Sequence, residues 1–244
     1  NDCEKYFEKI NIKAVELAQK ARDISKKDIL IAGGLPNQNQ TYSADLGKDL
    51  DLIEKNFYDQ AKLLQHGIDF FYLDVMSSGL ECEIALKMIE SFNLPVLVGI
   101  HLRDNGNLPS GEKITDVVKK YKNKNWLGVI MACISPGAYE LVINDLQKID
   151  IPYGFKINAF KKIPEGYTVA SKDQWGDAGN PTTVLGKNTD LNESKFYEYA
   201  KKFKENGATI LGGCCEIRPS HIKEISKLKW YSVYWIVLLD KFLI

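Results

Sequence analysis

The chain has 244 residues, 45% of them hydrophobic, which is enough for one globular α/β domain with a full core. Lysine plus arginine and aspartate plus glutamate both number 32, so the net charge is zero. Nothing in that balance favours nucleic acid or an anionic membrane surface as a partner. The five cysteines are an odd number and no signal-peptide pattern precedes them, which predicts a reducing, cytoplasmic compartment without a disulfide framework.

Helical and strand-like apolar patterns alternate along the chain. In chain order we expect a helix at 4–26, strand 28–36, helix 49–66, strand 69–74, helix 78–92, strand 95–101, helix 114–121, strand 126–132, helix 138–149, strand 152–159, helix 193–206, strand 209–211 and a helix opening at Pro219. The strands are short and apolar without alternation, as in a parallel sheet covered on both faces. The pattern predicts a parallel α/β fold with six strand–helix units, two fewer than a (β/α)8 barrel.

Two polar segments and the carboxyl end interrupt this pattern. Segment 37–47 is either a loop over a pocket or a plain surface loop, and segment 161–192 is either a lid or a mobile connection. No Gly-x-Gly-x-x-Gly follows the first strand, which counts against a dinucleotide fold. Residues 230–244 are mostly apolar but too short and too interrupted for a membrane span, so a packed tail, a partner-binding arm and a translation artefact all stay open.

Paired cysteines at the end of the last predicted strand are the strongest chemical signal. Gly212 and Gly213 precede Cys214 and Cys215, and they allow the chain to leave strand geometry so that both sulfurs can reach one partner. Two converging thiolates are good ligands for zinc, although buried cysteines also occur as small hydrophobic residues. Cys133 ends another apolar run and lies at the same edge if the strands are parallel. Three cysteines with one open position form the catalytic arrangement of zinc.

The segment Gly212-Gly213-Cys214-Cys215, followed by Pro219-Ser-His-Ile222, resembles the homocysteine S-methyltransferase family. Cys133 lies where the family has a further single cysteine, and the likeness runs from about residue 10 to residue 228. The resemblance implies a (β/α)8 TIM barrel over 1–228 from which the first two βα units are missing, followed by an apolar tail over 229–244. Six strands cannot close an eight-stranded barrel, so we expect a gap in the wall.

The resemblance also implies the site residues and the reaction. Cys133, Cys214 and Cys215 are expected to hold Zn2+, which would activate the thiol of homocysteine for attack on a methyl group. The methyl would come from a sulfonium or quaternary-ammonium donor, and the product would be methionine. Asp74 takes the place of a family glutamate that binds the substrate ammonium; as a carboxylate, it could equally be a solvated strand-end group.

Several residues depart from the family pattern or have a second interpretation. Ala132 stands where the family usually has asparagine, and Lys156-Ile-Asn158 keeps only the asparagine of a Tyr-Pro-Asn segment. We expect His221 to be a helix-start residue and His101 to be a structural histidine near the substrate. A catalytically degenerate zinc- or thiol-binding domain, or an inactive fragment of such an enzyme, is the alternative function.

Overall fold

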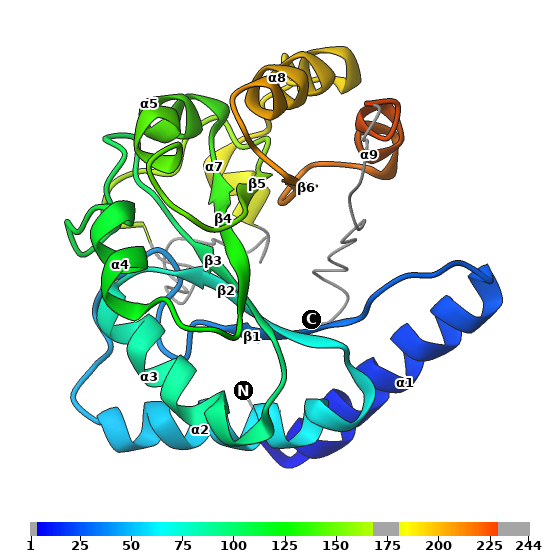
Figure 1. Cartoon of the computed structure of the whole chain (residues 1–244), viewed down its shortest axis with the longest axis vertical. Coiled ribbons are helices and arrows are strands. Elements are labelled where there is room, and N and C mark those ends of the chain that lie inside the picture. Colours follow the sequence, from blue (N-terminus) through cyan, green and yellow to red (C-terminus); the bar gives the residue numbers. More distant parts are fainter. Residues whose placement is uncertain (1–3, 168–180, 229–244) are drawn as a thin grey trace.

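The computed structural model describes residues 4–167 and 181–228, and every structural statement below concerns those ranges (Figure 1). Its strands are β1 (Ala32–Pro36), β2 (Phe70–Met76), β3 (Val96–Ile100), β4 (Trp126–Ile134), β5 (Tyr153–Ile157) and β6 (Ile210–Gly213). They form one sheet in the order β1-β2-β3-β4-β5-β6, and each neighbouring pair is parallel. The predicted parallel α/β architecture is therefore confirmed.

Helices lie between successive strands, as the alternating sequence pattern predicts, and one further helix precedes the first strand and another follows the last. They are α1 (Phe7–Ser25), α2 (Leu50–Leu64), α3 (Gly79–Ile89), α4 (Ile114–Tyr121), α5 (Pro136–Leu146), α7 (Pro181–Leu185), α8 (Glu193–Glu205) and α9 (Pro219–Ile225), with 3-10 turns at Glu4–Tyr6, Gln65–Gly67 and Glu90–Phe92. Four helices begin where a side-chain oxygen accepts a hydrogen bond from the backbone N–H three residues further on. These capping residues are Asp49, Ser78, Ser135 and Asn192.

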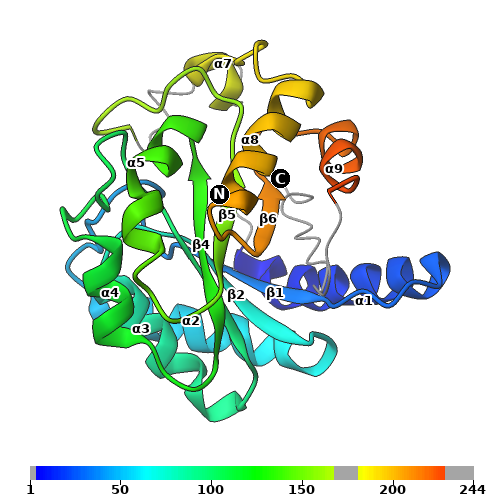
Figure 2. The ribbon, with the colours of Figure 1, turned by 45° about the horizontal axis from the view of Figure 1, so that its top comes forward.

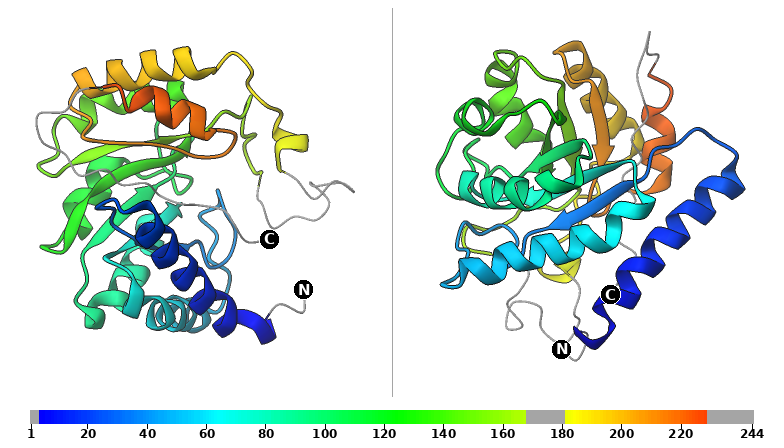
Figure 3. Two further views of the ribbon diagram at one scale, coloured as in Figure 1. Left: turned by 90° about the vertical axis from the view of Figure 1, so that its right-hand side faces the viewer. Right: turned by 60° about the horizontal axis from the view of Figure 1, so that its bottom comes forward.

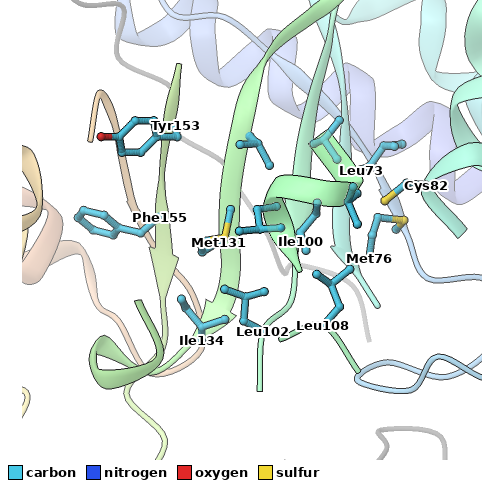
Figure 4. Close-up of a cluster of buried hydrophobic side chains, with 14 of the residues drawn as sticks. Leu73, Met76, Cys82, Ile100, Leu102, Leu108, Met131, Ile134, Tyr153 and Phe155 are labelled. Carbon is cyan, nitrogen blue, oxygen red and sulfur yellow. The ribbon is translucent and has the colours of Figure 1, made fainter. Parts of the chain in front are cut away.

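Helices α2, α3, α4, α5 and α8 form an arc around one side of the curved sheet (Figure 1). Because successive strand residues point to opposite faces, each strand supplies two layers of side chains. The layer beneath the helices is the main hydrophobic core and includes Leu73, Ile100, Met131 and Phe155 (Figure 4). The opposite face holds a smaller cluster, formed by Phe70, Tyr72, Leu97 and Ile130.

Strands β1 and β6 are the two edges of the sheet (Figure 2). They do not pair with each other in the described part of the chain, so the expected gap in the wall lies between them. Helix α9 packs beside α8 near one edge, and α1 packs beside α2 near the other (Figure 3). Helix α1 confirms the helix predicted over 4–26, but none of its residues is buried. Across 4–167 and 181–228, no helix has both the length and the apolarity needed to cross a membrane.

Most predicted boundaries agree with the structure to within a few residues, and the first and fourth strands show the differences of interest. The first strand begins at Ala32 rather than at residue 28. The fourth strand continues to Ile134, so Cys133 lies inside β4 rather than just after it. Residues 168–180 of the predicted polar segment and the apolar tail over 229–244 lie outside the described residues.

Candidate metal centre and active site

Cys133, Cys214 and Cys215 bring their sulfur atoms together at the carboxyl ends of β4 and β6. All three Sγ atoms lie within 4.8 Å of one another. Within the described ranges, no other three histidine, cysteine, aspartate or glutamate side chains come together in this way. The Sγ of Cys215 is 3.6 Å from that of Cys133 and 3.7 Å from that of Cys214. Cys133 is buried and the other two are half-buried. The structure thus brings together the three cysteines that the sequence singled out.

The paired cysteines converge because the chain leaves strand geometry where β6 ends. Strand β6 stops at Gly213, and a turn follows in which the N–H of Ile217 donates to the carbonyl of Cys214 over 3.0 Å. Backbone hydrogen bonds tie both cysteines to the end of β5: the N–H of Cys214 donates to Ile157, and the carbonyl of Cys215 accepts from Ala159. The predicted departure from strand geometry is confirmed, but it begins after the two glycines, which both lie within β6, and the left-handed residue of the turn is Glu216, with a φ of 64°.

A β-bulge turns the side chain of Cys133 toward the pair. The register between β4 and β5 shifts between Ala132 and Ile134, and Cys133 itself has a left-handed φ of 53°. In a regular strand Cys133 would share the outward face of Met131. The bulge instead places Cys133 in a cluster with Ala132 and the paired cysteines. Ile134 then packs in the main hydrophobic core beneath the helices, called the outer core below.

Strand β2 carries a matching irregularity across the site. The register between β2 and β3 shifts between Leu73 and Met76, and Val75 has a φ of 61°. Val75 consequently faces the cluster around Cys133, while Met76 enters the outer core. Left-handed backbone at a β-branched residue is strained, and such strain concentrates at functional sites.

Three polar side chains surround Cys133. The hydroxyl of Tyr42 lies 3.1 Å from its Sγ, and the side-chain amide of Asn158 donates to its carbonyl oxygen over 2.8 Å. His101 Nδ1 lies 3.2 Å from the carbonyl oxygen of Ala132, and its ring contacts that of Tyr42 with centroids 4.6 Å apart. All three side chains are buried, so they fix the position of Cys133 from several sides.

Without a cation the sulfur cluster is poorly suited to ionise. Contacts with Cys214 and Cys215, together with burial, raise the pKa of Cys133 well above its ordinary value. The hydrogen bond with Cys133 lowers the pKa of Cys214, but the contact with Cys215 and burial outweigh it and bring the value to about 11. Burial also lowers the pKa of His101 to about 4, so that ring is neutral near neutral pH. A divalent cation would offset the repulsion among the three thiolates.

The spacing of the sulfurs fits a tetrahedral metal. A tetrahedral zinc ion with Zn–S bonds of about 2.3 Å holds its sulfur ligands about 3.8 Å apart. Two of the sulfur pairs, at 3.6 and 3.7 Å, lie near that separation. Three thiolates and one remaining position match the ligand set of a zinc site that also accepts a substrate.

Asp74, the predicted substrate ligand, lies in an ion pair. Its Oδ1 accepts a hydrogen bond from the ammonium of Lys156 over 2.9 Å and another from the hydroxyl of Tyr72 over 2.7 Å. The side chain of Lys156 is 1% exposed and that of Asp74 is 15% exposed. The sequence did not reveal this pairing, and the role of Asp74 in substrate binding stays a prediction.

A cavity of about 600 Å³ lies beside the cluster. Its wall includes Tyr42 and Asn158, which both contact Cys133, so the cavity ends one side chain away from the sulfurs. His101 and Phe160 add aromatic surface to the wall, and residues 161–166 cover another side. The described start of the predicted polar segment therefore does lie over a pocket. Tyr42, in the polar loop at 37–47, lines the same pocket.

The two histidines agree with their predicted roles. At the start of α9, Nδ1 of His221 accepts a hydrogen bond from the N–H of Arg218, and Nε2 lies 3.1 Å from the carbonyl oxygen of Leu191. His221 is thus a helix-start residue and does not belong to the sulfur cluster. His101 is buried and hydrogen-bonded, and it also lines the cavity.

Two known proteins have sequences similar to that of this chain. Homocysteine S-methyltransferase 2 of Arabidopsis thaliana is 21% identical over 243 residues, covering 88% of this chain and 69% of the relative. The selenocysteine methyltransferase of Astragalus bisulcatus is 23% identical over 236 residues, covering 91% of this chain and 65% of the relative.

Solved structures extend the likeness to the fold. The crystal structure of the metallated form of the homocysteine methyltransferase MmuM from Escherichia coli matches with a TM-score of 0.68 and 17% identity, over 89% of this chain and 69% of that one. Its apo form matches with a TM-score of 0.66. This likeness confirms the predicted barrel type of fold. A family model described as homocysteine S-methyltransferase matches residues 1–228, and the chain belongs to that family.

Proposed function

We propose that this chain transfers a methyl group from a sulfonium or quaternary-ammonium donor to the thiol of homocysteine, giving methionine. The observation that carries the proposal is the meeting of the Cys133, Cys214 and Cys215 sulfurs beside a cavity large enough for two small substrates. Membership of the homocysteine S-methyltransferase family supports the same reaction.

In this proposal the three cysteines hold one Zn2+. When bound, the ion supplies a Lewis acid that keeps the acceptor sulfur as a nucleophilic thiolate near neutral pH. The protein holds the cysteines in place through the turn at Cys214–Cys215, the bulge at Cys133 and the hydrogen bonds from Tyr42 and Asn158. These fixed positions align the two reactants, so less entropy is lost when they meet.

Asp74 is assigned to the ammonium of the acceptor. Its carboxylate lies on the inner face of β2, and its contacts with Lys156 and Tyr72 fix the position of Oδ1. Asp74→Asn removes the charge at nearly constant size. We expect it to raise KM for homocysteine more than it lowers kcat, because the ammonium is equally remote from the reacting sulfur in the ground and transition states.

The aromatic wall of the cavity is assigned to the methyl donor. Tyr42, His101 and Phe160 line this space, and Tyr167 packs in the same cluster. Sulfonium and quaternary-ammonium groups are attracted to the faces of aromatic rings. A cationic donor is therefore better suited to this wall than an anionic one.

The test has two readouts. Purified protein should contain about one zinc per chain by elemental analysis, and Cys214→Ser should lose it. Methionine formation from homocysteine is then measured with betaine, S-methylmethionine or S-adenosylmethionine as donor. Zinc binding without turnover on any donor would favour a zinc-binding domain without catalysis, and absence of both would refute the proposal. Cys82→Ser is the matched control, because Cys82 is a buried cysteine of the outer core.

A further inference from the structure

Lys156 is a fully buried lysine on the strand between the two that carry the cysteines. In the sheet it pairs with Ala132 of β4 on one side and Gly212 of β6 on the other. Alternate residues of a strand share a face, so Lys156 points to the same side as Asn158, whose amide donates to Cys133. Lys156 therefore lies one layer below the sulfur cluster.

The inner face makes room for this side chain because a neighbouring strand carries glycine. A Cβ on Gly212 would lie 3.8 Å from Cγ of Lys156, which shows that the lysine stem runs along the bare backbone of β6. Gly99 of β3 has the same relation to Tyr72, whose hydroxyl would lie 2.5 Å from a Cβ added there. Tyr72 in turn donates to Asp74, the carboxylate that also accepts from Lys156.

The charge of Lys156 is preserved by its partners. An ammonium can stay buried when it is paired and hydrogen-bonded, and Asp74 meets both conditions over 2.9 Å. The ammonium also lies 5.0 Å from the ring centroid of Tyr72, close enough for a cation–π contact. Lys156 thus places a positive charge in the interior beneath the site, in register with Gly212, which is two residues before Cys214.

A metal site of this composition needs such a charge. Three thiolates exceed the charge of one divalent cation by one negative unit, and a thiolate acceptor would add another. In a half-buried setting that excess is costly unless a positive group lies nearby. Apart from Lys156, no lysine or arginine side chain in the described part of the chain is buried.

We propose that Lys156 is a positioning residue that acts as the counter-charge of the sulfur cluster and raises its affinity for a divalent metal ion. The proposal rests on the metal site of the proposed function.

The experiment measures metal affinity of the full chain at one neutral pH, with Co2+ alone as the spectroscopic probe and a competing chelator. Lys156→Met keeps the length of the side chain and removes its charge. Lys148→Met is the matched control, because it removes the same charge from an exposed lysine far from the cysteines. The double variant Lys156→Met/Asp74→Asn replaces the ion pair by two neutral groups, so it avoids an unpaired buried carboxylate that could unfold the single variant.

We expect Lys156→Met to weaken Co2+ binding about tenfold, as the loss of one nearby positive charge requires. The double variant loses one positive and one negative charge, so its affinity should return to within a few-fold of wild type. The thiolate-to-cobalt absorption bands should stay unchanged, and Lys148→Met should bind like wild type. Asp74→Asn removes the negative charge paired with Lys156 and should tighten Co2+ binding, so unchanged or weaker binding in that variant would overturn the counter-charge role, as would wild-type affinity in Lys156→Met. Altered cobalt bands would overturn it too, by pointing to distortion. Failure of wild type to bind any metal would refute the proposed function itself.

Discussion

The hydroxyl of Tyr42 lies 3.1 Å from the Sγ of Cys133, at a separation in sequence of 91 residues. When Cys133 is a thiolate it has no proton to give, so the tyrosine must be the donor. Burial raises the pKa of Tyr42, which keeps the phenol protonated and able to donate. The contact links the loop after β1 to the bulge in β4 and so couples the wall of the cavity to a candidate metal ligand.

We predict that Tyr42→Phe weakens Zn2+ or Co2+ binding about fivefold, the effect of losing one hydrogen bond to a thiolate. Phenylalanine retains the ring that packs on His101, so the fold should be nearly as stable as wild type. Chelator competition gives the affinity and thermal unfolding gives the stability. Tyr58→Phe is the control, since Tyr58 is stacked on Phe92 at a partly exposed position. Equal affinity in both variants would mean that the Tyr42 contact does not stabilise the thiolate.

The sequence was sufficient to predict the sheet and the three cysteines. Short apolar runs between helical patterns identified all six strands of the described sheet. The glycine pair before Cys214 indicated where the chain leaves β6. These features depend on local sequence, because the spacing of apolar residues and the position of a glycine pair are encoded within a few residues.

What the sequence could not predict depends on contacts between distant strands. The bulges at Val75 and Cys133 place non-glycine residues at positive φ, and neither residue type signals such a conformation. Tyr42 is one tyrosine in a polar loop, and only the fold brings it to Cys133. The ion pair of Lys156 with Asp74 joins β5 to β2, two strands that are not neighbours in the sheet.

A second prediction concerns Glu81, which is 1% exposed at the start of α3. Its Oε2 accepts hydrogen bonds from the N–H of Ser77 and from the side chain of Asn37, and burial nevertheless raises its pKa above the ordinary value. A carboxyl group whose pKa is higher in the folded state than in the unfolded state stabilises the fold when it is protonated. This contribution is fully present at pH values below the pKa of the unfolded state. That contribution is lost as pH rises through the folded pKa.

Glu81→Gln should therefore become more stable relative to wild type as the pH rises from acidic to neutral, because glutamine keeps an acceptor oxygen without the buried charge. Urea unfolding at several pH values between those limits provides the measurement. Glu83→Gln, on the exposed side of the same helix, should give a difference from wild type that hardly changes with pH. A constant difference for Glu81→Gln would show that its carboxyl group is not perturbed by folding.

A third prediction uses the two glycines before the paired cysteines. A Cβ on Gly213 would lie 2.3 Å from Cγ2 and 2.7 Å from Cβ of Ile217, and the Cβ cannot move away without moving the backbone. A Cβ on Gly212 would meet its nearest neighbours at 3.5 and 3.8 Å, which are ordinary contacts. We expect Gly213→Ala to lower the free energy of unfolding by about 1–3 kcal/mol through overpacking.

Because Ile217 closes the turn that holds Cys214, the same substitution should displace a sulfur and weaken metal binding, whereas Gly212→Ala should change both quantities little. Urea unfolding and chelator competition, applied to both variants, separate a local effect on the turn from a general intolerance of side chains in β6. Equal losses in the two variants would show that the glycine pair serves the strand as a whole. A loss confined to Gly213→Ala would assign to Gly213 the close approach that brings the paired cysteines to Cys133.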